Sequence, residues 1–133
     1  MKYLLVLLLF IVNYLNASDY ELKLYENVLG SVFSEKVIYI YSSEDELSEL
    51  IDSSIILKRV DSCIEATVLM EKKSIDECND KPLFATSYKT YKNKKNAFGV
   101  FYWRKGRPQL KLNLKAMHKF NLSLPKNLQS YAY

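Results

Sequence analysis

The sequence predicts an α/β fold with three layers, a mainly parallel sheet, a C-terminal antiparallel hairpin and short terminal helices. Two observations support this prediction. Over residues 19–95, short runs of β-branched and aromatic residues alternate with helical segments, as strands and crossover helices do in a parallel sheet. Over residues 97–114, two extended segments flank a short basic loop that contains Gly106, which is the pattern of a hairpin at one edge of the sheet.

The first seventeen residues are typical of a secretory signal peptide. Lys2 provides a short positive start, residues 3–12 form an apolar run, and Ala17 stands at the expected cleavage site. The run is shorter than the roughly 20 residues of a membrane-spanning helix, so an uncleaved anchor is the less favoured alternative. The mature chain would be residues 18–133, which is the size of a single α/β domain.

A helix and a strand are expected at the start of this domain. Apolar residues recur at spacings of three and four, which predicts an amphipathic helix over residues 19–33. Ser18 or Asp19 would cap its first turn. Residues 37–41 (VIYIY) are β-branched or aromatic throughout, so we expect a strand that is buried on both faces.

A second helix and two more strands follow. Ser42 and Ser43 are expected to cap the helix, whose first turn is acidic and whose apolar stripe includes Leu47 and Ile51. Strands are expected at residues 55–60 and 66–70, with a helical turn over residues 61–65 between them.

The middle of the chain predicts a fourth strand and a short helix. Residues 74–78 are interpreted as one helical turn, and residues 82–86 as the strand. Ser87 would cap the short helix, with Tyr88 and Tyr91 facing inward.

The C-terminal third predicts the hairpin and two short helices. The hairpin strands, residues 97–103 and 109–114, would be joined by a loop in which Gly106 adopts a positive φ. The first helix would cover residues 115–120 and end at Asn121. Pro125 would open the last one, with Leu128 and Tyr131 on its buried side.

Cys63 and Cys78 are the only cysteines of the chain. In an exported protein this even number predicts one disulfide. In the chain-entropy model, a bridge that closes the loop between these cysteines stabilises the folded state by about 3 kcal/mol. Two reduced, buried thiols are the alternative. The spacing fits neither a redox pair nor a zinc site.

Acidic and basic residues are segregated along the chain. Residues 18–80 hold fifteen acids and six bases, whereas residues 81–133 hold twelve bases and no acid. We therefore expect a polarised surface whose most positive point is the hairpin loop.

Two basic clusters interleaved with aromatic residues are candidates for binding a partner or an anion. Export disfavours a nucleic-acid ligand, which leaves either a solvated basic face or a surface for an anionic partner. The candidate residues are Lys89, Lys92, Tyr102, Trp103, Arg104, Lys105 and Arg107.

The residues that usually carry catalysis do not form a recognisable set. His118 is the only histidine, and no serine-nucleophile motif accompanies it. The first strand leads into an acidic segment that would repel phosphates. We therefore expect no enzymatic activity, no metal and no cofactor.

A small-ligand pocket is expected at the carboxyl ends of the parallel strands, where open α/β sheets bind their ligands. The candidate residues for this pocket are Ser42, Ser43, Thr86, Ser87 and Tyr88. A small anionic solute is the ligand expected there.

The C-terminal segment carries a family resemblance. Residues 98–132 (FGVFYWRKGRPQLKLNLKAMHKFNLSLPKNLQSYA) contain a glycine-bearing hairpin strand, the pair Asn113-Leu114, a short helix and a leucine-rich end. This segment resembles the end of the YfiR-like periplasmic proteins. The resemblance implies a non-enzymatic periplasmic regulator, often a homodimer, that binds the periplasmic domain of an inner-membrane signalling protein such as a diguanylate cyclase and restrains it. A periplasmic module that binds a small anionic solute is the alternative.

Overall fold

The computed structural model describes the backbone of residues 2–133 and the side chains from Ser18 onward. The predicted signal peptide, residues 1–17, lies outside the residues whose side chains are described. Within the described part of the chain, no helix is both long enough and apolar enough to cross a membrane.

The described residues form six strands and six helical elements. The strands are β1 (Ile38–Tyr41), β2 (Leu57–Arg59), β3 (Val68–Glu71), β4 (Leu83–Ala85), β5 (Ala97–Arg104) and β6 (Arg107–Leu112). The helical elements are α1 (Lys2–Phe33), α2 (Asp45–Asp52), the 3-10 helix η1 (Cys63–Glu65), α3 (Tyr88–Asn93), α4 (Leu114–Lys119) and the 3-10 helix η2 (Lys126–Tyr131).

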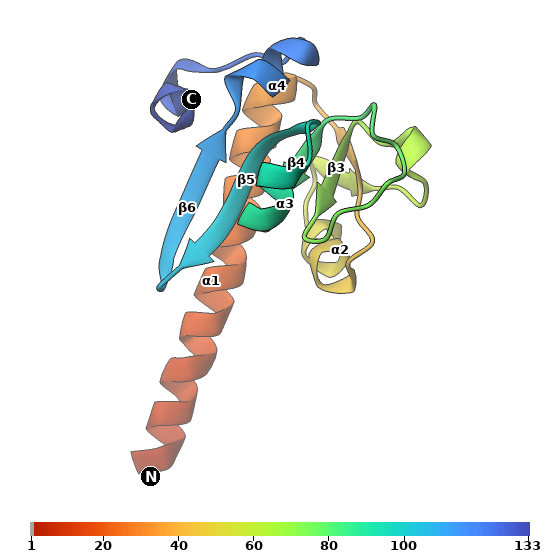
Figure 1. Ribbon diagram of the computed structural model, residues 1–133. Coiled ribbons are helices and arrows are strands. Elements are labelled where there is room, and N and C mark those ends of the chain that lie inside the picture. Colours follow the sequence, from red (N-terminus) through yellow and green to blue (C-terminus); the bar gives the residue numbers. More distant parts are fainter. Residues whose placement is uncertain (1) are drawn as a thin grey trace.

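The predicted fold class is confirmed, because the strands form one mainly parallel sheet (Figure 1). The strand order is β2-β1-β3-β4-β5-β6. All neighbouring strands are parallel except β5 and β6, which form the antiparallel hairpin at one edge.

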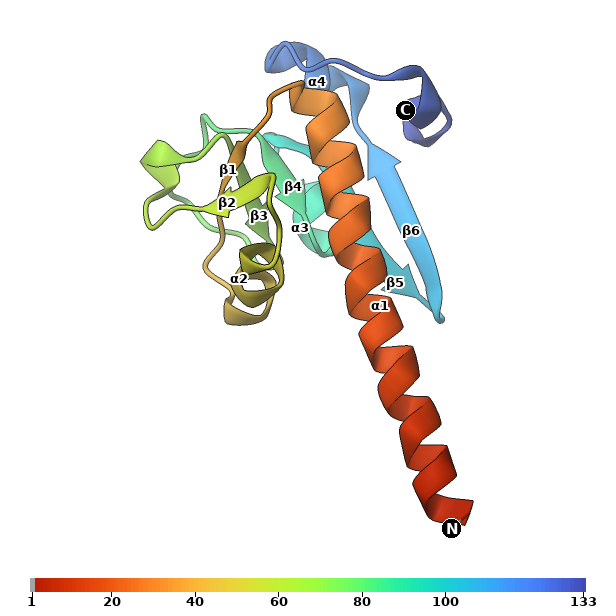
Figure 2. The same ribbon diagram turned by 180° about the vertical axis from the view of Figure 1, so that it is seen from behind.

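The main core lies between the sheet and α1, which crosses one face of the sheet and continues beyond it (Figure 2). Leu29 of α1, Ile51 of α2 and Phe84 of β4 are fully buried there. α3 lies on the opposite face, so the helices and the sheet form three layers (Figures 1 and 2).

A second, smaller core lies on the other face of the sheet, beneath the disulfide. Cys63 and Cys78 are bonded, with their Cα atoms 6.1 Å apart, which confirms the predicted bridge. Cys63 packs with Leu69, Leu83 and Ala97. The bridge therefore fixes the connection between β3 and β4 over a core with few large side chains. A disulfide is typical of an oxidising compartment.

A bulge in β5 sets the direction of its aromatic residues. Leu83 pairs with Ala97, but Phe84 pairs with Gly99, so Phe98 is an extra residue in β5. Beyond the bulge, Trp103 lies beside Tyr20 of α1, with ring centroids 6.0 Å apart. Consecutive side chains of β5 therefore point alternately toward α1 and toward α3.

Three expectations for the N-terminal half are wrong. α1 does not begin at Ser18 or Asp19 but at Lys2, and Asp19 forms an ion pair with Lys23 within the helix at 3.1 Å. β1 is not buried on both faces, because Tyr39 is 47% exposed where α3 does not cover the sheet. Glu44 stands at the N-cap of α2 and makes no side-chain capping bond, so Ser42 and Ser43 do not cap it.

Several boundaries also differ from the prediction. β2 begins only at Leu57, and residues 74–78 form no helix; Cys78, with a φ of 55°, lies in a turn instead. The hairpin loop is shorter than expected, because Arg104 pairs with Arg107. Lys105 and Gly106 thus form a two-residue turn in which both φ angles are positive.

In two short helices one of the residues predicted to face inward is exposed. Tyr91 of α3 packs against the second core as predicted, but Tyr88 is exposed. Thr90 is the buried residue of α3, and its hydroxyl donates a 2.6 Å hydrogen bond to the Lys72 carbonyl. Leu128 is buried in η2 as predicted, but Tyr131 is exposed.

The predicted ends of two helices are confirmed. Ser87 accepts a hydrogen bond from the Thr90 amide and so caps α3. The predicted turn over residues 61–65 contains η1, in which Ser62 accepts a hydrogen bond from the Ile64 amide. Asn121 follows α4 with a φ of 53°, as expected of a residue that ends a helix.

Candidate functional site

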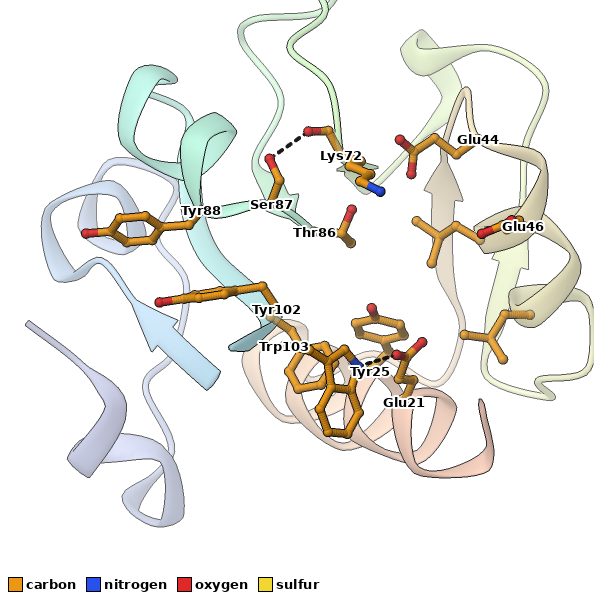
Figure 3. A pocket seen from close by; sticks show the side chains of 13 residues that line it. Glu21, Tyr25, Glu44, Glu46, Lys72, Thr86, Ser87, Tyr88, Tyr102 and Trp103 are labelled. Carbon is orange, nitrogen blue, oxygen red and sulfur yellow. Dashed lines mark hydrogen bonds between the residues drawn. The ribbon is translucent and has the colours of Figure 1, made fainter. Parts of the chain in front are cut away.

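The site at the carboxyl ends of the strands is a pocket of about 450 Å³ between α1, α2, β4 and β5 (Figure 3). This is where open α/β sheets bind ligands, and the volume suits a small molecule. The lining residues are Glu21, Tyr25, Glu44, Glu46, Leu47, Leu50, Lys72, Thr86, Ser87, Tyr88, Phe101, Tyr102 and Trp103.

The loop that brings Glu44 to the pocket is held from below by Glu71, the last residue of β3. The amide and the hydroxyl of Ser43 donate hydrogen bonds to the two carboxylate oxygens of Glu71, at 2.9 and 2.7 Å. The Ser42 hydroxyl in turn accepts a 3.2 Å bond from the Glu44 amide. These contacts fix the backbone from which the Glu44 side chain projects.

Glu71 is fully buried, and burial raises the pKa of its carboxyl above 4.5. The hydrogen bonds from Ser43 oppose this rise, and the nearby charge of Glu44 adds to it. Both carboxylate oxygens are occupied by Ser43, so we assign Glu71 a positioning role beneath the pocket.

Tyr25 and Glu21 form the α1 wall of the pocket. The Tyr25 ring packs edge-on against Phe84 and Phe101, with centroids 6.0 and 5.9 Å apart. Burial, together with the charges of Glu21 and Glu44, raises the pKa of the Tyr25 hydroxyl well above 10. This hydroxyl therefore stays protonated at neutral pH and is available as a hydrogen-bond donor.

Glu21 also holds the indole of Trp103. The indole N–H donates a 2.6 Å hydrogen bond to Glu21 Oε1, and this bond joins α1 to the end of β5 (Figure 3). Trp103 remains 43% exposed. It therefore lies both at the mouth of the pocket and on the outer surface.

Three of the five predicted pocket residues line this pocket, namely Thr86, Ser87 and Tyr88. Ser42 and Ser43 do not line it; they support its rim through Glu44 and Glu71. The charge of the pocket differs from the one expected. Three glutamates and one lysine line it, so it is net negative rather than suited to an anion.

The predicted basic candidates are divided between the hairpin and α3. Trp103, Arg104, Lys105 and Arg107 lie together at the hairpin end, beside Tyr20 of α1. Lys89 and Lys92 belong to α3 on the opposite face of the sheet. Tyr102 contacts Tyr88, with centroids 5.4 Å apart, and so lies between the two groups.

A lysine-lined groove of about 730 Å³ lies between α3 and α4. Its residues are Tyr91, Lys92, Asn93, Lys94, Lys95, Asn113, Lys115, Ala116 and Lys119. The sequence pointed to the hairpin loop as the most positive point, yet five lysines meet here and no acid lines the groove. Because residues 81–133 contain no acid, elements from this segment bring only positive charge to it.

Sequence reasoning missed the residues that give the pocket its charge. Glu21 and Tyr25 belong to a helix whose pattern indicated only core packing, and Glu44 and Glu46 were interpreted as helix-start residues. Glu71, which supports the pocket from beneath, did carry a local signal, because it is an acid at the end of a buried apolar strand. Among the described residues, no group of histidine, cysteine or acidic side chains could hold a metal ion.

No protein-family model matches this chain, and comparison with curated proteins gives no match either. The chemistry and placement of the two pockets and of the hairpin surface therefore carry the functional argument.

Proposed function

We propose that this protein is an exported, non-enzymatic binding module that contacts the periplasmic domain of an inner-membrane signalling protein. The disulfide is compatible with export. The YfiR-like character of residues 98–132 is what suggests a regulator of a membrane protein such as a diguanylate cyclase. The observation that carries the proposal is the composition of the hairpin end.

The hairpin end combines exposed aromatic and basic side chains. Trp103 and Tyr20 are 43% and 46% exposed and lie against each other. Arg104, Lys105 and Arg107 follow within four residues of Trp103. Tryptophan, tyrosine and arginine are the residues that most often dominate binding energy at protein interfaces. The positive charge of Arg104, Lys105 and Arg107 fits a partner with an acidic surface. Attraction between the two surfaces would also speed their association.

Charge reversal at the hairpin end tests this proposal. We expect the variant Arg104→Glu, Lys105→Glu, Arg107→Glu to lose the partner, whereas Lys58→Glu on the opposite edge strand should retain it. The measurement is capture of the tagged protein from cross-linked envelopes, followed by identification of the bound proteins. Recovery of only soluble or outer-membrane proteins, or equal recovery by both variants, would contradict the proposal. Light scattering of the purified protein tests the homodimer that the resemblance implies.

The second candidate function is binding of a small anionic solute, and the lysine groove favours it. Asp76 lies 3.3 Å from Lys94, but no salt bridge among the described residues engages the other four lysines. Lys92 lies 5.5 Å from the centre of the Tyr88 ring, and Lys119 lies 5.4 Å from that of Phe120. These contacts restrain two ammonium groups before any anion binds.

Thermal melting with citrate and pyrophosphate tests the anion site. We expect both anions to raise the melting temperature of the wild type, and Lys115→Gln with Lys119→Gln to abolish the rise. Lys58→Gln with Lys126→Gln, which changes two exposed lysines outside the groove, is the control with the same charge change. A melting temperature that neither anion changes would refute this second function.

A further inference from the structure

Beyond the proposed function, we infer that the pocket at the carboxyl ends of the strands binds a small organic cation, a ligand with an amine next to a flat apolar group. The charge of the lining points this way. Glu21, Glu44 and Glu46 contribute three carboxylates, against one ammonium from Lys72. No salt bridge among the described residues neutralises any of these three carboxylates.

The helix dipole does not reverse this preference. The positive end of α2 would by itself favour an anion. However, Glu44 and Glu46 lie at that end together with Asp45, so the helix terminus already has negative charge beside it. An incoming anion would have to approach these carboxylates, whereas a cation would be stabilised by them.

Two polar groups of the pocket lack partners. Tyr25 is only 3% exposed, yet its hydroxyl takes part in no hydrogen bond of the described residues. Figure 3 shows this hydroxyl pointing toward the space between Thr86, Glu44 and Glu21. Thr86 Oγ1 is the one buried side-chain oxygen or nitrogen without a partner in the described part of the chain. Because an unpartnered buried hydroxyl destabilises a fold, Thr86 Oγ1 points to a polar ligand, and the Tyr25 hydroxyl at the pocket is a second group that can bond to it.

The remaining wall of the pocket suits the apolar part of such a ligand. Phe101 and Trp103 line it on the α1 side of β5, and Tyr102, Leu47 and Leu50 contribute further apolar surface. Aromatic rings attract amines through cation–π interactions, which strengthen when water is excluded. Among the described residues no group of three or more histidine, cysteine or acidic side chains could hold a metal ion, and the aromatic lining instead fits an organic cation.

A matched pair of probes tests the sign of the charge. Trp103 is the only tryptophan of the chain and lies at the pocket mouth, so its fluorescence reports occupancy. We expect benzylammonium to change this fluorescence saturably and benzoate, which has a similar shape and the opposite charge, to bind at least about tenfold more weakly. Equal binding of the two probes, or no saturable change with benzylammonium, would overturn the inference.

Charge-neutralising variants locate the site. Glu44→Gln and Glu46→Gln should each weaken benzylammonium binding about tenfold, the loss expected of a charge-assisted contact of about 1.4 kcal/mol. Glu49→Gln is the control, because Glu49 lies on the same helix, is exposed and does not line the pocket. A loss of affinity in Glu49→Gln as large as in Glu44→Gln would exclude this pocket as the site.

Two further variants separate binding from folding. Thr86→Val and Tyr25→Phe remove the unpartnered hydroxyls and keep the apolar bulk. We expect both to leave the melting temperature of the free protein unchanged or higher, while benzylammonium binds several-fold more weakly. If they lower the melting temperature and leave the affinity unchanged, the hydroxyls serve the fold and the inference fails.

Discussion

Gly99→Ala is predicted to destabilise the protein through one identifiable clash. Gly99 lies in β5 between Phe84 of β4 and Leu112 of β6. A Cβ atom at Gly99 would lie 2.8 and 2.9 Å from two ring carbons of Phe84 and 3.0 Å from Leu112 Cδ2. Carbon atoms normally stay about 3.5–4.0 Å apart, so the neighbours would have to move by roughly 0.6 Å or more.

The Phe84 ring has little room for this movement. It is fully buried, with Tyr25 and Phe98 packed against it at centroid distances of 6.0 and 5.8 Å. Overpacking of this kind costs about 1–3 kcal/mol. For a domain of this size, we therefore expect the melting temperature to fall by about 4–12 °C.

Thermal and urea unfolding of matched variants measures the effect. Gly30→Ala is the control, because its nearest neighbour, Ile56 Cδ1, lies at an ordinary 3.7 Å and Gly30 lies within α1. This second substitution should stabilise the protein by roughly 0.5–1 kcal/mol, so the same chemical change has opposite signs at the two sites.

A double variant tests the cause of the loss. Phe84→Leu removes the ring atom Cε2 and replaces the rigid ring by a smaller side chain that can rotate away from residue 99, so Gly99→Ala should cost clearly less in the Phe84→Leu background. A Gly99→Ala protein that melts at or above the wild-type temperature would refute the reasoning. An equal cost in both backgrounds would show that Phe84 is not the neighbour responsible.

Two other predictions concern Glu71 and the disulfide. The folded state raises the pKa of Glu71 above 4.5, so it binds the proton more tightly than the unfolded state does. The stabilisation by Glu71 is therefore present below pH 4.5 and is lost as the pH rises through the folded pKa. Urea unfolding at several pH values measures the free energy of unfolding of the wild type minus that of Glu71→Gln. This difference should fall as the pH rises over this range, and an increase would contradict the predicted sign. Replacing Cys63 and Cys78 by serine should cost about 3 kcal/mol in urea unfolding under oxidising conditions, and an unchanged midpoint would show that the second core is stable without the bridge.

The fold class was predictable because its signals are local. Short β-branched runs alternate with capped helices, and a glycine-bearing turn separates two extended segments, so each element could be found within a few residues of sequence. The errors arose where tertiary contacts compete with local preference. Ser43 is a good helix cap by type, but its hydroxyl donates to Glu71, which is 28 residues away.

The candidate site was predictable only in its location. The rule that ligands bind at the carboxyl ends of parallel strands led to Thr86, Ser87 and Tyr88, which line the pocket. The charge of the pocket was not predictable, because Glu21 and Tyr25 come from a helix far away in sequence. Counting charges along the chain gives no indication of which side chains meet in space.

The sequence alone thus determined the layers, the parallel sheet, the hairpin and the disulfide, since hydrophobic periodicity, turn residues and two cysteines specify them. The tertiary structure decided where the charges lie. α1 and α2 bring glutamates to the pocket, while α3 and α4 bring lysines to the groove. Packing across the sheet joins segments that are distant in sequence. Acidic and basic residues that are separated along the chain therefore line an acidic pocket and a lysine-rich groove of one molecule.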